Sequence, residues 1–557
     1  MLLGVLGVVA IYLVLSDKPS FTLSNTPQTL AIRLRGAMPD GPGEGEFNLD
    51  PEKYTVYQGD YAFGIRAAAQ DPSISALQIH IDGPQIGMAG AQEIRQAIQA
   101  FAATGKPCVA WSKSYDNLDY YLATGCNQVH MHPQGSTMVL GLRVQTQHFA
   151  GTLEKLGVEP QFLRIGDYKS APESFTSTAP SAPTQEMMLS MLDSLHGQFV
   201  EEIAAARNLE EDAFQALIDD PPVTAKQALE AGLVDALESP VDLDESVGIR
   251  MYLNSLADQR KSGPQIGVLH VQGTIVDGNS SGDAFGGTSS GDKDIVAHLE
   301  QLRDDDEIAA IVMRVNSPGG SAMASDLIWQ AVVEADAIKP VVISMGRSAA
   351  SGGYYISAPA RRIFAQPATL TGSIGIFAGK MSLAGLYEKI GVSTWSANRG
   401  ELAGIYDPQR PFSDLEQEKL QEVLREFYDT FIDKVAQGRD LSIEEVDGLG
   451  QGRVWTGAQA VENGLADELG GLSDAIDAAE ALAGLPEGAY DLVVLPAPAT
   501  LFEALMEGLN PDIDAQALLL SVLREEDGGA AGEMLRLAPV LEQNGLAAAL
   551  PFRIQVQ

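Results

Sequence analysis

The residue in this sequence whose setting best suits covalent chemistry is Ser351. It lies in VVISMGRSAASGGYYI, residues 341–356, where an apolar, β-branched run gives way to small residues before an apolar pattern resumes. This order predicts a buried strand, a tight turn and the start of a helix. Such a junction can present a hydroxyl beside free backbone N–H groups, so a nucleophile and oxyanion donors come from one segment. The alternative is that Ser351 only caps the helix, because serine is a preferred cap residue.

Two further segments end in similar turns. Residues 308–328, IAAIVMRVNSPGGSAMASDLI, indicate a strand, a turn at Ser317–Gly320 and a helix, and residues 367–377, PATLTGSIGIF, place another small-residue turn before a strand. The glycine pair in the first of these turns allows a ligand to approach the backbone closely, as a second oxyanion donor requires. We therefore expect the three turns to meet at one site.

The elements that would position these turns occur twice in the chain. Ser75–Ile98 parallels Ala309–Val332 at an offset of 234 residues, and Val223–Leu237 parallels Trp455–Leu469 at an offset of 232. Similarity of this kind within one chain indicates a repeated structural unit. We predict two copies of one α/β domain, residues 50–250 and 251–480, which together make up most of the chain.

The two copies differ at the residues that could do chemistry. Ser351 falls opposite Asn117, and the Ser-Pro-Gly-Gly turn falls opposite Gly83–Ile86, so the first copy lacks the serine and the glycine pair. Lys169, in GDYKSAPESFT, falls opposite Ala403, so the second copy lacks the lysine. A neutral lysine can serve as the general base for a serine hydroxyl. The duplication thus favours a site shared between the copies over a solvated loop lysine and a capping serine.

Charge and cysteine content limit the remaining functions. The 557 residues carry a net charge of −39, which argues against a nucleic-acid binder because phosphate contacts need clustered Lys and Arg. The two cysteines, Cys108 and Cys126, are too few for a disulfide framework or a cysteine-rich metal site. We expect them to be buried free thiols, with pairing to each other as the alternative. No cofactor or metal is expected.

The two ends of the chain fall outside the copies. Residues 1–16 begin with the uncharged apolar run MLLGVLGVVAIYLVL, which is short for a span and has no basic segment before it. We predict a membrane anchor there, with a cleaved signal as the alternative. Residues 17–49 are expected to be mainly a linker, although Leu30–Leu34 could form a strand. Residues 481–557 are expected to be a tail that begins with a strand-like run at 490–495.

Taken together, these motifs closely resemble signal peptide peptidase A of the long, two-repeat type. The resemblance covers residues 50–480 and rests on the duplication and on GDYKSAPESFT, NSPGG, SAASGGYYIS and TLTGSIGIF, which follow one another along the chain. It implies a tandem pair of Clp-protease/crotonase-like domains and a homotetramer held in the bacterial inner membrane, with the catalytic domain on the periplasmic side. It also implies a cofactor-free enzyme whose substrates are signal peptides left in the membrane after preprotein processing.

The resemblance also assigns roles by position. It makes Ser351 the nucleophile, Lys169 the general base and Ser373 the hydroxyl that orients the lysine. We interpret Gly320 and Gly352 as the oxyanion donors. Lysine must be neutral to take a proton, and lowering its pKa from about 10.4 to about 7 requires roughly 4.6 kcal/mol, which burial could supply. We therefore expect Lys169 to lie desolvated against Ser351 where the two copies meet.

Two other functions stay open from the sequence. A crotonase-type acyl-CoA enzyme would share the fold and the oxyanion donors, but it would not need a serine and a lysine divided between two copies. A membrane-tethered scaffold without catalytic activity would need neither residue.

Overall fold

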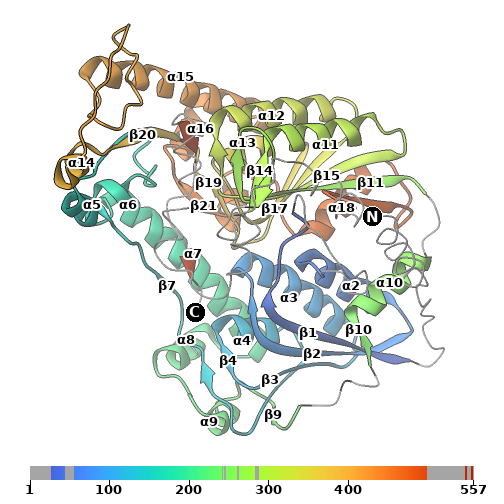
Figure 1. Ribbon diagram of the computed structural model, residues 1–557. Coiled ribbons are helices and arrows are strands. Elements are labelled where there is room, and N and C mark those ends of the chain that lie inside the picture. Colours follow the sequence, from blue (N-terminus) through green and yellow to red (C-terminus); the bar gives the residue numbers. More distant parts are fainter. Residues whose placement is uncertain are drawn as a thin grey trace, which may run out of the picture.

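The computed structural model describes residues 27–43, 56–240, 243, 246–259, 263–282 and 288–497, with two short strands at 546–548 and 554–555. Two largely parallel sheets form its two halves, one from the blue to green part of the chain and one from the yellow-green to orange part (Figure 1). The expected anchor, residues 1–16, lies outside the described residues. Within those ranges, no helix has the length and apolarity needed to cross a membrane.

The first sheet has six parallel strands in the order β10-β1-β2-β3-β5-β9. The strands are β1 Gln28–Ala37, β2 Ile74–Gln85, β3 Cys108–Ser112, β5 Gln128–Met131, β9 Ala236–Leu237 and β10 Val247–Gly248. The helices of this half are α2 Gln58–Gln70, α3 Met88–Ala103, α4 Asn117–Ala123, α5 Ala150–Leu156, α6 Glu173–Thr176, α7 Ala182–Arg207, α8 Glu211–Asp219, α9 Ala225–Glu230 and α10 Ile249–Gln259.

The second sheet has eight strands, and its inner strands are apolar runs buried on both faces, as in other covered parallel sheets. The strands are β11 Gln265–Gln272, β15 Ile308–Ser317, β17 Val341–Ala350, β18 Arg362–Ala365, β19 Leu370–Gly372, β21 Val454–Thr456, β22 Glu468–Leu469 and β23 Asp491–Leu495. The helices are α11 Asp292–Asp304, α12 Ala322–Asp336, α13 Gly352–Ser357, α14 Ala384–Ile390, α15 Asp414–Arg439, α16 Ile443–Leu449, α17 Gly457–Glu462 and α18 Leu472–Leu482.

The two sheets confirm the duplication. Hydrogen-bonded neighbours in the second sheet run β23-β11-β15-β17-β18-β22, which is the order of the first sheet strand for strand. The long helices α7 and α15 have 26 residues each and occupy corresponding places in the chain. The predicted strand, turn and helix around Ser351 are β17 and α13, except that Ser348–Ala350 continue the strand instead of belonging to the turn.

A third, seven-stranded sheet joins the two halves in the order β13-β14-β12-β16-β24-β20-β8. Its strands are β8 Glu159–Ile165, β12 Thr274–Val276, β13 Ser281–Gly282, β14 Thr288–Gly291, β16 Gly320–Ser321, β20 Ile376–Ser382 and β24 Leu546–Ala548. Two further pairs are β4 Tyr115–Asp116 with β6 Thr137–Met138, and β7 Arg143–Val144 with β25 Ile554–Gln555. Because β8 comes from the first half and β20 from the second, this sheet attaches one repeat to the other.

The sheets begin and end outside the predicted domain limits. The alternative strand at Leu30–Leu34 is confirmed as part of β1, which pairs with β2 and β10, so the first sheet includes residues from the expected linker. The strand-like run at 490–495 forms β23 beside β11, so the second sheet includes the first part of the expected tail. The Pro- and Gly-rich stretch directly after β1 is typical of a linker, and for this reason the sequence did not show that β1 belongs to the first sheet.

The prediction of free thiols was wrong. Cys108 and Cys126 form a disulfide, and their Cα atoms lie 5.0 Å apart. Cys108 is the first residue of β3, and Cys126 follows α4. Helix α4 brings the chain back to the end of the sheet where β3 begins, and this places the two cysteines together. That return is a tertiary feature, and each cysteine alone resembles an ordinary buried thiol.

Candidate active site

Lys169 is carried to the second half of the molecule by an extended arm of the first half. Strand β8 pairs antiparallel with β20, with Ile165 opposite Ile376. The chain then turns at Gly166, whose φ of +106° suits glycine, and a Cβ there would lie 2.3 Å from the backbone of Gln451. The lysine four residues after the strand is therefore placed by the second repeat, although it belongs to the first.

The backbone around Lys169 is held on two sides. Arg164 donates a hydrogen bond to the carbonyl oxygen of Lys169 at 3.0 Å and forms an ion pair with Glu173 at 2.8 Å. On the other side, Tyr168 donates its backbone N–H to Gln451, and a Cβ on Gly452 would approach the backbone nitrogen of Lys169 to 2.4 Å. Only a glycine at position 452 permits this close approach.

The side chain of Lys169 is completely buried, so the alternative of a solvated loop cation is wrong. Its Nζ lies 2.7 Å from Oγ of Ser351 and 3.0 Å from both the carbonyl oxygen and Oγ of Ser373. Burial lowers the pKa of this amine from 10.5 to about 7, because the charged form loses its hydration. A substantial fraction of Lys169 is therefore neutral near pH 7 and able to accept a proton.

Ser351 occupies the N-cap position of α13 but does not cap it. Its side chain makes no capping hydrogen bond, and its backbone has φ of +55° and ψ of −115°. Non-glycine residues at positive φ are strained by about 1 to 3 kcal/mol, and such strain is typical of functional sites. The hydrogen bond from the Ser351 N–H to Gly372 at 2.8 Å holds this turn and directs the hydroxyl toward Lys169.

Gly320 and Gly352 lie side by side next to Ser351. A Cβ on Gly352 would lie 2.5 Å from Oγ of Ser325 and 3.2 Å from the backbone nitrogen of Gly320. A Cβ on Gly320 would lie only 1.9 Å from the carbonyl oxygen of Ile275. Both positions exclude a side chain, and so they bring two backbone segments together beside the hydroxyl. Their role as oxyanion donors stays a prediction.

Ser373 contacts the lysine amine from the end of β19, the strand that pairs with β17. It follows β19, has φ of +51° and donates its backbone N–H to Arg453 at 2.7 Å. The strand before it is tied to β17 by the hydroxyl of Thr371, which donates to the carbonyl of Ala349 at 2.7 Å. The three predicted turns therefore do meet, and the arm after β8 brings Lys169 to Ser351 and Ser373 there.

Sequence reasoning missed the contribution of Gln451 and Gly452. Both have positive φ, 55° and 79°, and their backbones form the wall behind Lys169. The signal was a Gly-Gln-Gly turn at 450–452 directly before the second copy of the repeated segment at 455–469. That turn has no equivalent in the first copy, where Asp219 and Asp220 stand at the corresponding positions.

The first copy uses the position of the nucleophile differently. Asn117, opposite Ser351, accepts hydrogen bonds from the N–H groups of Leu140 and Gly141 at 2.8 and 3.2 Å. Its side-chain amide donates to the carbonyl of Gly141 at 2.8 Å. Ala403, opposite Lys169, is exposed on a loop. Polar side chains hold the turn of the first copy, while the second copy keeps a buried hydroxyl facing an amine.

Comparison with known protein families shows which family this chain belongs to. The model of peptidase family S49 matches residues 100–247 and 334–486, one match in each repeat, and the Clp protease model matches residues 288–370. The chain belongs to peptidase family S49. It is a serine peptidase with a Clp-protease-like α/β fold built from two S49 repeats, and the family resemblance inferred from its motifs is confirmed.

Two relatives match most of the length of this S49 peptidase, and a third matches less than half of it. Serine protease SPPA, chloroplastic, from Arabidopsis thaliana is 32% identical over 501 residues, which cover 86% of this chain and 73% of the relative. Protease 4 from Haemophilus influenzae is 33% identical over 524 residues, 86% of this chain and 83% of the relative. A putative signal peptide peptidase SppA from Enterococcus faecium is 35% identical over 221 residues, 40% of this chain and 64% of the relative. These relationships favour peptide hydrolysis over acyl-CoA chemistry.

Proposed function

We propose that this S49 peptidase is a membrane-anchored endopeptidase that uses Ser351 and Lys169 as a Ser-Lys dyad and degrades cleaved signal peptides at the membrane. The observation that carries the proposal is the 2.7 Å separation between the lysine Nζ and the serine Oγ, made by two completely buried residues from different repeats. A scaffold without catalysis would have no need to bury an amine against a hydroxyl, because burial destabilises the charged amine.

The contacts support a two-stage acyl-transfer mechanism. Neutral Lys169 accepts the proton of the Ser351 hydroxyl as Oγ bonds to the scissile carbonyl carbon. The resulting ammonium gives that proton to the leaving amine when the C–N bond breaks, which leaves an acyl ester on Ser351. Lys169 then takes a proton from a water molecule that attacks the ester, and returns it to Oγ as the ester bond breaks. The cycle restores both residues and needs no other base.

Two further features suit this cycle. The backbone N–H groups of Gly320 and Gly352 are the proposed donors to the tetrahedral oxyanion, an interaction worth about 3 to 4 kcal/mol per donor in comparable sites. The carbonyl and hydroxyl of Ser373, each 3.0 Å from Nζ, fix the amine so that its lone pair can face Ser351. These contacts support the orienting role that we propose for Ser373.

The third sheet supports an extended peptide as substrate. Strand β24 pairs antiparallel with β16 at Gly320 and Ser321 and with β20 at Phe377 and Ala378. The space between β16 and β20, directly beside one proposed oxyanion donor, therefore accepts an extended chain through main-chain hydrogen bonds. A peptide substrate bound in the same way would be recognised mainly by its backbone, which suits a peptidase that degrades varied sequences.

We further propose that the enzyme is a homotetramer anchored by residues 1–16 in the bacterial inner membrane, with its catalytic domain on the periplasmic side. The Cys108–Cys126 disulfide supports an oxidising compartment. Exposed apolar side chains around α14, with Ile390 62% and Trp395 89% exposed, support contact with another copy. In the first repeat, the segment that corresponds to α14 and the residues after it is the arm that carries Lys169, and this arm packs against the second repeat. We propose that the α14 segment packs in the same way against a neighbouring copy of the protein.

The proposal is tested by hydrolysis of a synthetic signal peptide in detergent micelles, followed by mass spectrometry of the products. The parent chain should cleave it internally, whereas Ser351→Ala and Lys169→Ala should both be inactive. Lys226→Ala is a suitable control because this lysine is 82% exposed on α9. Turnover of a thioester without peptide cleavage would instead favour the acyl-CoA enzyme, and unchanged cleavage by either active-site variant would refute the dyad.

A further inference from the structure

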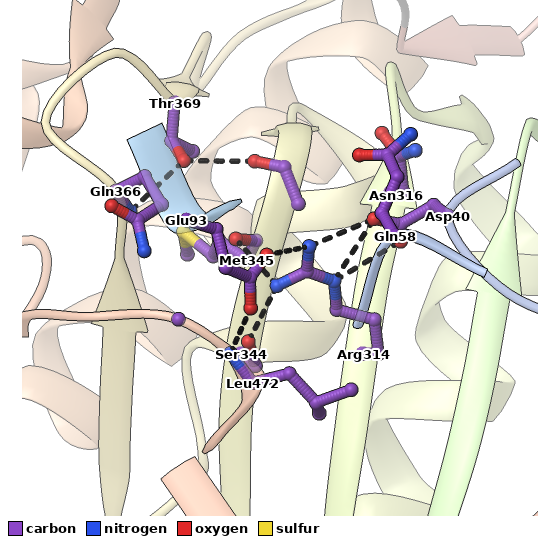
Figure 2. A network of polar contacts seen from close by, with 12 residues as sticks. Asp40, Gln58, Glu93, Arg314, Asn316, Ser344, Met345, Gln366, Thr369 and Leu472 are labelled. Atoms are coloured by element: carbon purple, nitrogen blue, oxygen red, sulfur yellow. Dashed lines mark hydrogen bonds and ion pairs between the residues drawn. The ribbon is translucent and has the colours of Figure 1, made fainter. Parts of the chain in front are cut away.

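A buried ion cluster lies where the first repeat meets the strands that carry the active-site serine. Figure 2 shows the guanidinium of Arg314, on β15, between the carboxylates of Asp40 and Glu93. Its nitrogens lie 2.8 and 3.0 Å from the two oxygens of Asp40 and 2.7 Å from Oε2 of Glu93. Asp40 follows β1 and Glu93 lies on α3, so both carboxylates come from the first repeat and the arginine from the second.

All three side chains are almost inaccessible to water, with 2% of Arg314 and 3% and 5% of Asp40 and Glu93 exposed. Burial acts to raise the pKa of Asp40, but the charge and hydrogen bonds of Arg314 outweigh it and hold that pKa below its usual value. Neighbouring His270, whose pKa burial lowers to about 4, adds no charge to the cluster near pH 7. Buried ion pairs contribute little net stability, so a role in fixing one arrangement of the parts is a better account of them.

The duplication shows that the cluster belongs to this one junction. At the offset of 234 residues, Arg314 falls opposite His80, and Glu93 falls opposite Leu327, which is 40% exposed. Equivalent helix and strand positions in the two repeats therefore carry different chemistry. The charged residues occur where α3 of the first repeat packs against the second sheet. Like Ser351 and Lys169, each of them is present in one repeat and absent from the equivalent position of the other.

The cluster is connected to the strand that ends at Ser351. Arg314 donates to Oγ of Ser344 at 2.8 Å and toward the carbonyl of Met345 at 3.5 Å, and both residues lie on β17. At the next position, a Cβ on Gly346 would lie 3.2 Å from Oδ2 of Asp40. The guanidinium and its carboxylate partner therefore pack along β17 in the run that leads to the nucleophile.

A neighbouring residue of α3 holds the segment that leads to Ser373. Next to Glu93, Gln92 accepts a hydrogen bond at 2.7 Å from the backbone N–H of Ala368, two residues before β19 begins. Figure 2 shows Thr369 in this network, and its hydroxyl donates to the carbonyl of Gly346 on β17 at 2.8 Å. Glu93 also accepts from the first N–H of α18, at Leu472. Helix α3 of the first repeat thus contacts both β17, which leads to Ser351, and the segment before β19, which leads to Ser373.

We propose that Arg314, held between Asp40 and Glu93, is a positioning residue that fixes the end of β17 and the segment before Ser373 relative to Lys169. This inference rests on the proposed Ser-Lys dyad and names a residue group that sets its geometry. Arginine suits the role because its planar fork engages two carboxylates and a hydroxyl at fixed angles, whereas lysine offers a point charge. Displacement of a reacting group by about 1 Å can cost on the order of 100-fold in rate.

The test compares kcat, KM and the rate of Ser351 labelling by a fluorophosphonate in the whole 557-residue chain. Arg314→Lys keeps the charge and loses the fork, and we expect kcat and labelling to fall by about 10-fold or more with KM changed by less than about twofold. Arg207→Lys is the matched control, because Arg207 is 9% exposed, lies on α7 and pairs with Asp235 entirely inside the first repeat. It should lose a similar amount of thermal stability while keeping parental kcat.

A second variant, Glu93→Gln, tests the same inference if Arg314→Lys fails to fold. Glu93→Gln keeps the size and the acceptor oxygen but removes the charge, and we expect a loss of kcat in the same direction. Parental kcat in both folded variants, or losses no larger than that of Arg207→Lys, would overturn the positioning role. Ser351→Ala separates the two claims: activity in that variant would refute the dyad, whereas an inactive Ser351→Ala beside a fully active Arg314→Lys would refute only the present inference.

Discussion

Nζ of Lys169 and Oγ of Ser351 lie 2.7 Å apart although 182 positions separate the two residues in the chain. The lysine belongs to the first repeat and the serine to the second, and the arm made by β8 spans the gap by pairing with β20. Neither repeat holds both groups, so the contact forms only when the two repeats have docked. The chemistry expected of this peptidase is consequently tied to the packing between its two halves.

The first prediction concerns the pH dependence of hydrolysis. Burial holds the pKa of Lys169 at about 7, and only the neutral amine can accept the serine proton. The kcat/KM of the parent should therefore rise with pH through a midpoint near 7 and level off above it. The control Lys226→Ala, altered at an exposed lysine, should show the same midpoint. An acid limb near pH 4 to 5 would indicate a carboxylate as the base and contradict this assignment.

The second prediction concerns stability. The amine of Lys169 has a pKa of about 7 in the folded state against 10.5 when exposed, so between these values the unfolded chain binds more protons and stability rises with pH. Lys169→Met removes the buried amine, and we expect it to stabilise the fold by on the order of 3 kcal/mol at pH 7 while abolishing activity. Thermal unfolding at several pH values measures this. A lower Tm than the parent at pH 7 would show that the amine is not destabilising.

The third prediction concerns Ser373. Replacing it by alanine removes one of two contacts to Nζ and leaves the carbonyl contact at 3.0 Å. We expect kcat to fall by about 10-fold with little change in KM, since the amine is less well oriented but still present. Ser357→Ala is the matched control, because that buried hydroxyl bonds only to Gly353 of its own helix among the described contacts. Equal kcat values for the two variants would remove the orienting role.

The fourth prediction concerns the proposed oxyanion donors. A methyl group on Gly352 would meet Oγ of Ser325 at 2.5 Å and crowd Gly319 and Gly320, so Gly352→Ala should displace both donors. We expect a loss of about 100-fold in kcat at nearly constant KM. Gly197→Ala, in α7 with no atom within 4 Å of the added methyl, is the matched control and should keep parental activity. A folded Gly352→Ala protein with parental kcat would mean that other groups stabilise the oxyanion.

The sequence predicted the duplication and the serine and lysine because a duplicated chain supplies its own comparison. Ser351 stands opposite Asn117 and Lys169 opposite Ala403, and these differences mark the positions where the copies diverged in chemistry. Local patterns also predicted β15, β17 and their helices, since the apolar runs are long and end at glycine or serine.

Features that depend on how distant elements pack together were not predictable in this way. Arg314 lies in an apolar strand run and Glu93 in a helix, and nothing in either pattern shows that they will meet across the two repeats. The wall formed by Gln451 and Gly452 is equally distant in sequence from the lysine it contacts. Pairing of Cys108 with Cys126 required knowing how α4 returns to β3. Each of these contacts depends on how separate elements pack together, and the hydrophobic periodicity of a single segment contains no information about that packing.

The most direct test of the dyad is the rate at which a fluorophosphonate modifies the parent chain, with the modified residue identified by mass spectrometry. The probe reports the nucleophile without requiring the natural substrate. The account predicts one modified residue, Ser351, with a labelling rate that rises through a midpoint near pH 7 and falls by at least about 100-fold in Lys169→Met. Modification of a different residue, or equally fast labelling of Ser351 in Lys169→Met, would contradict it.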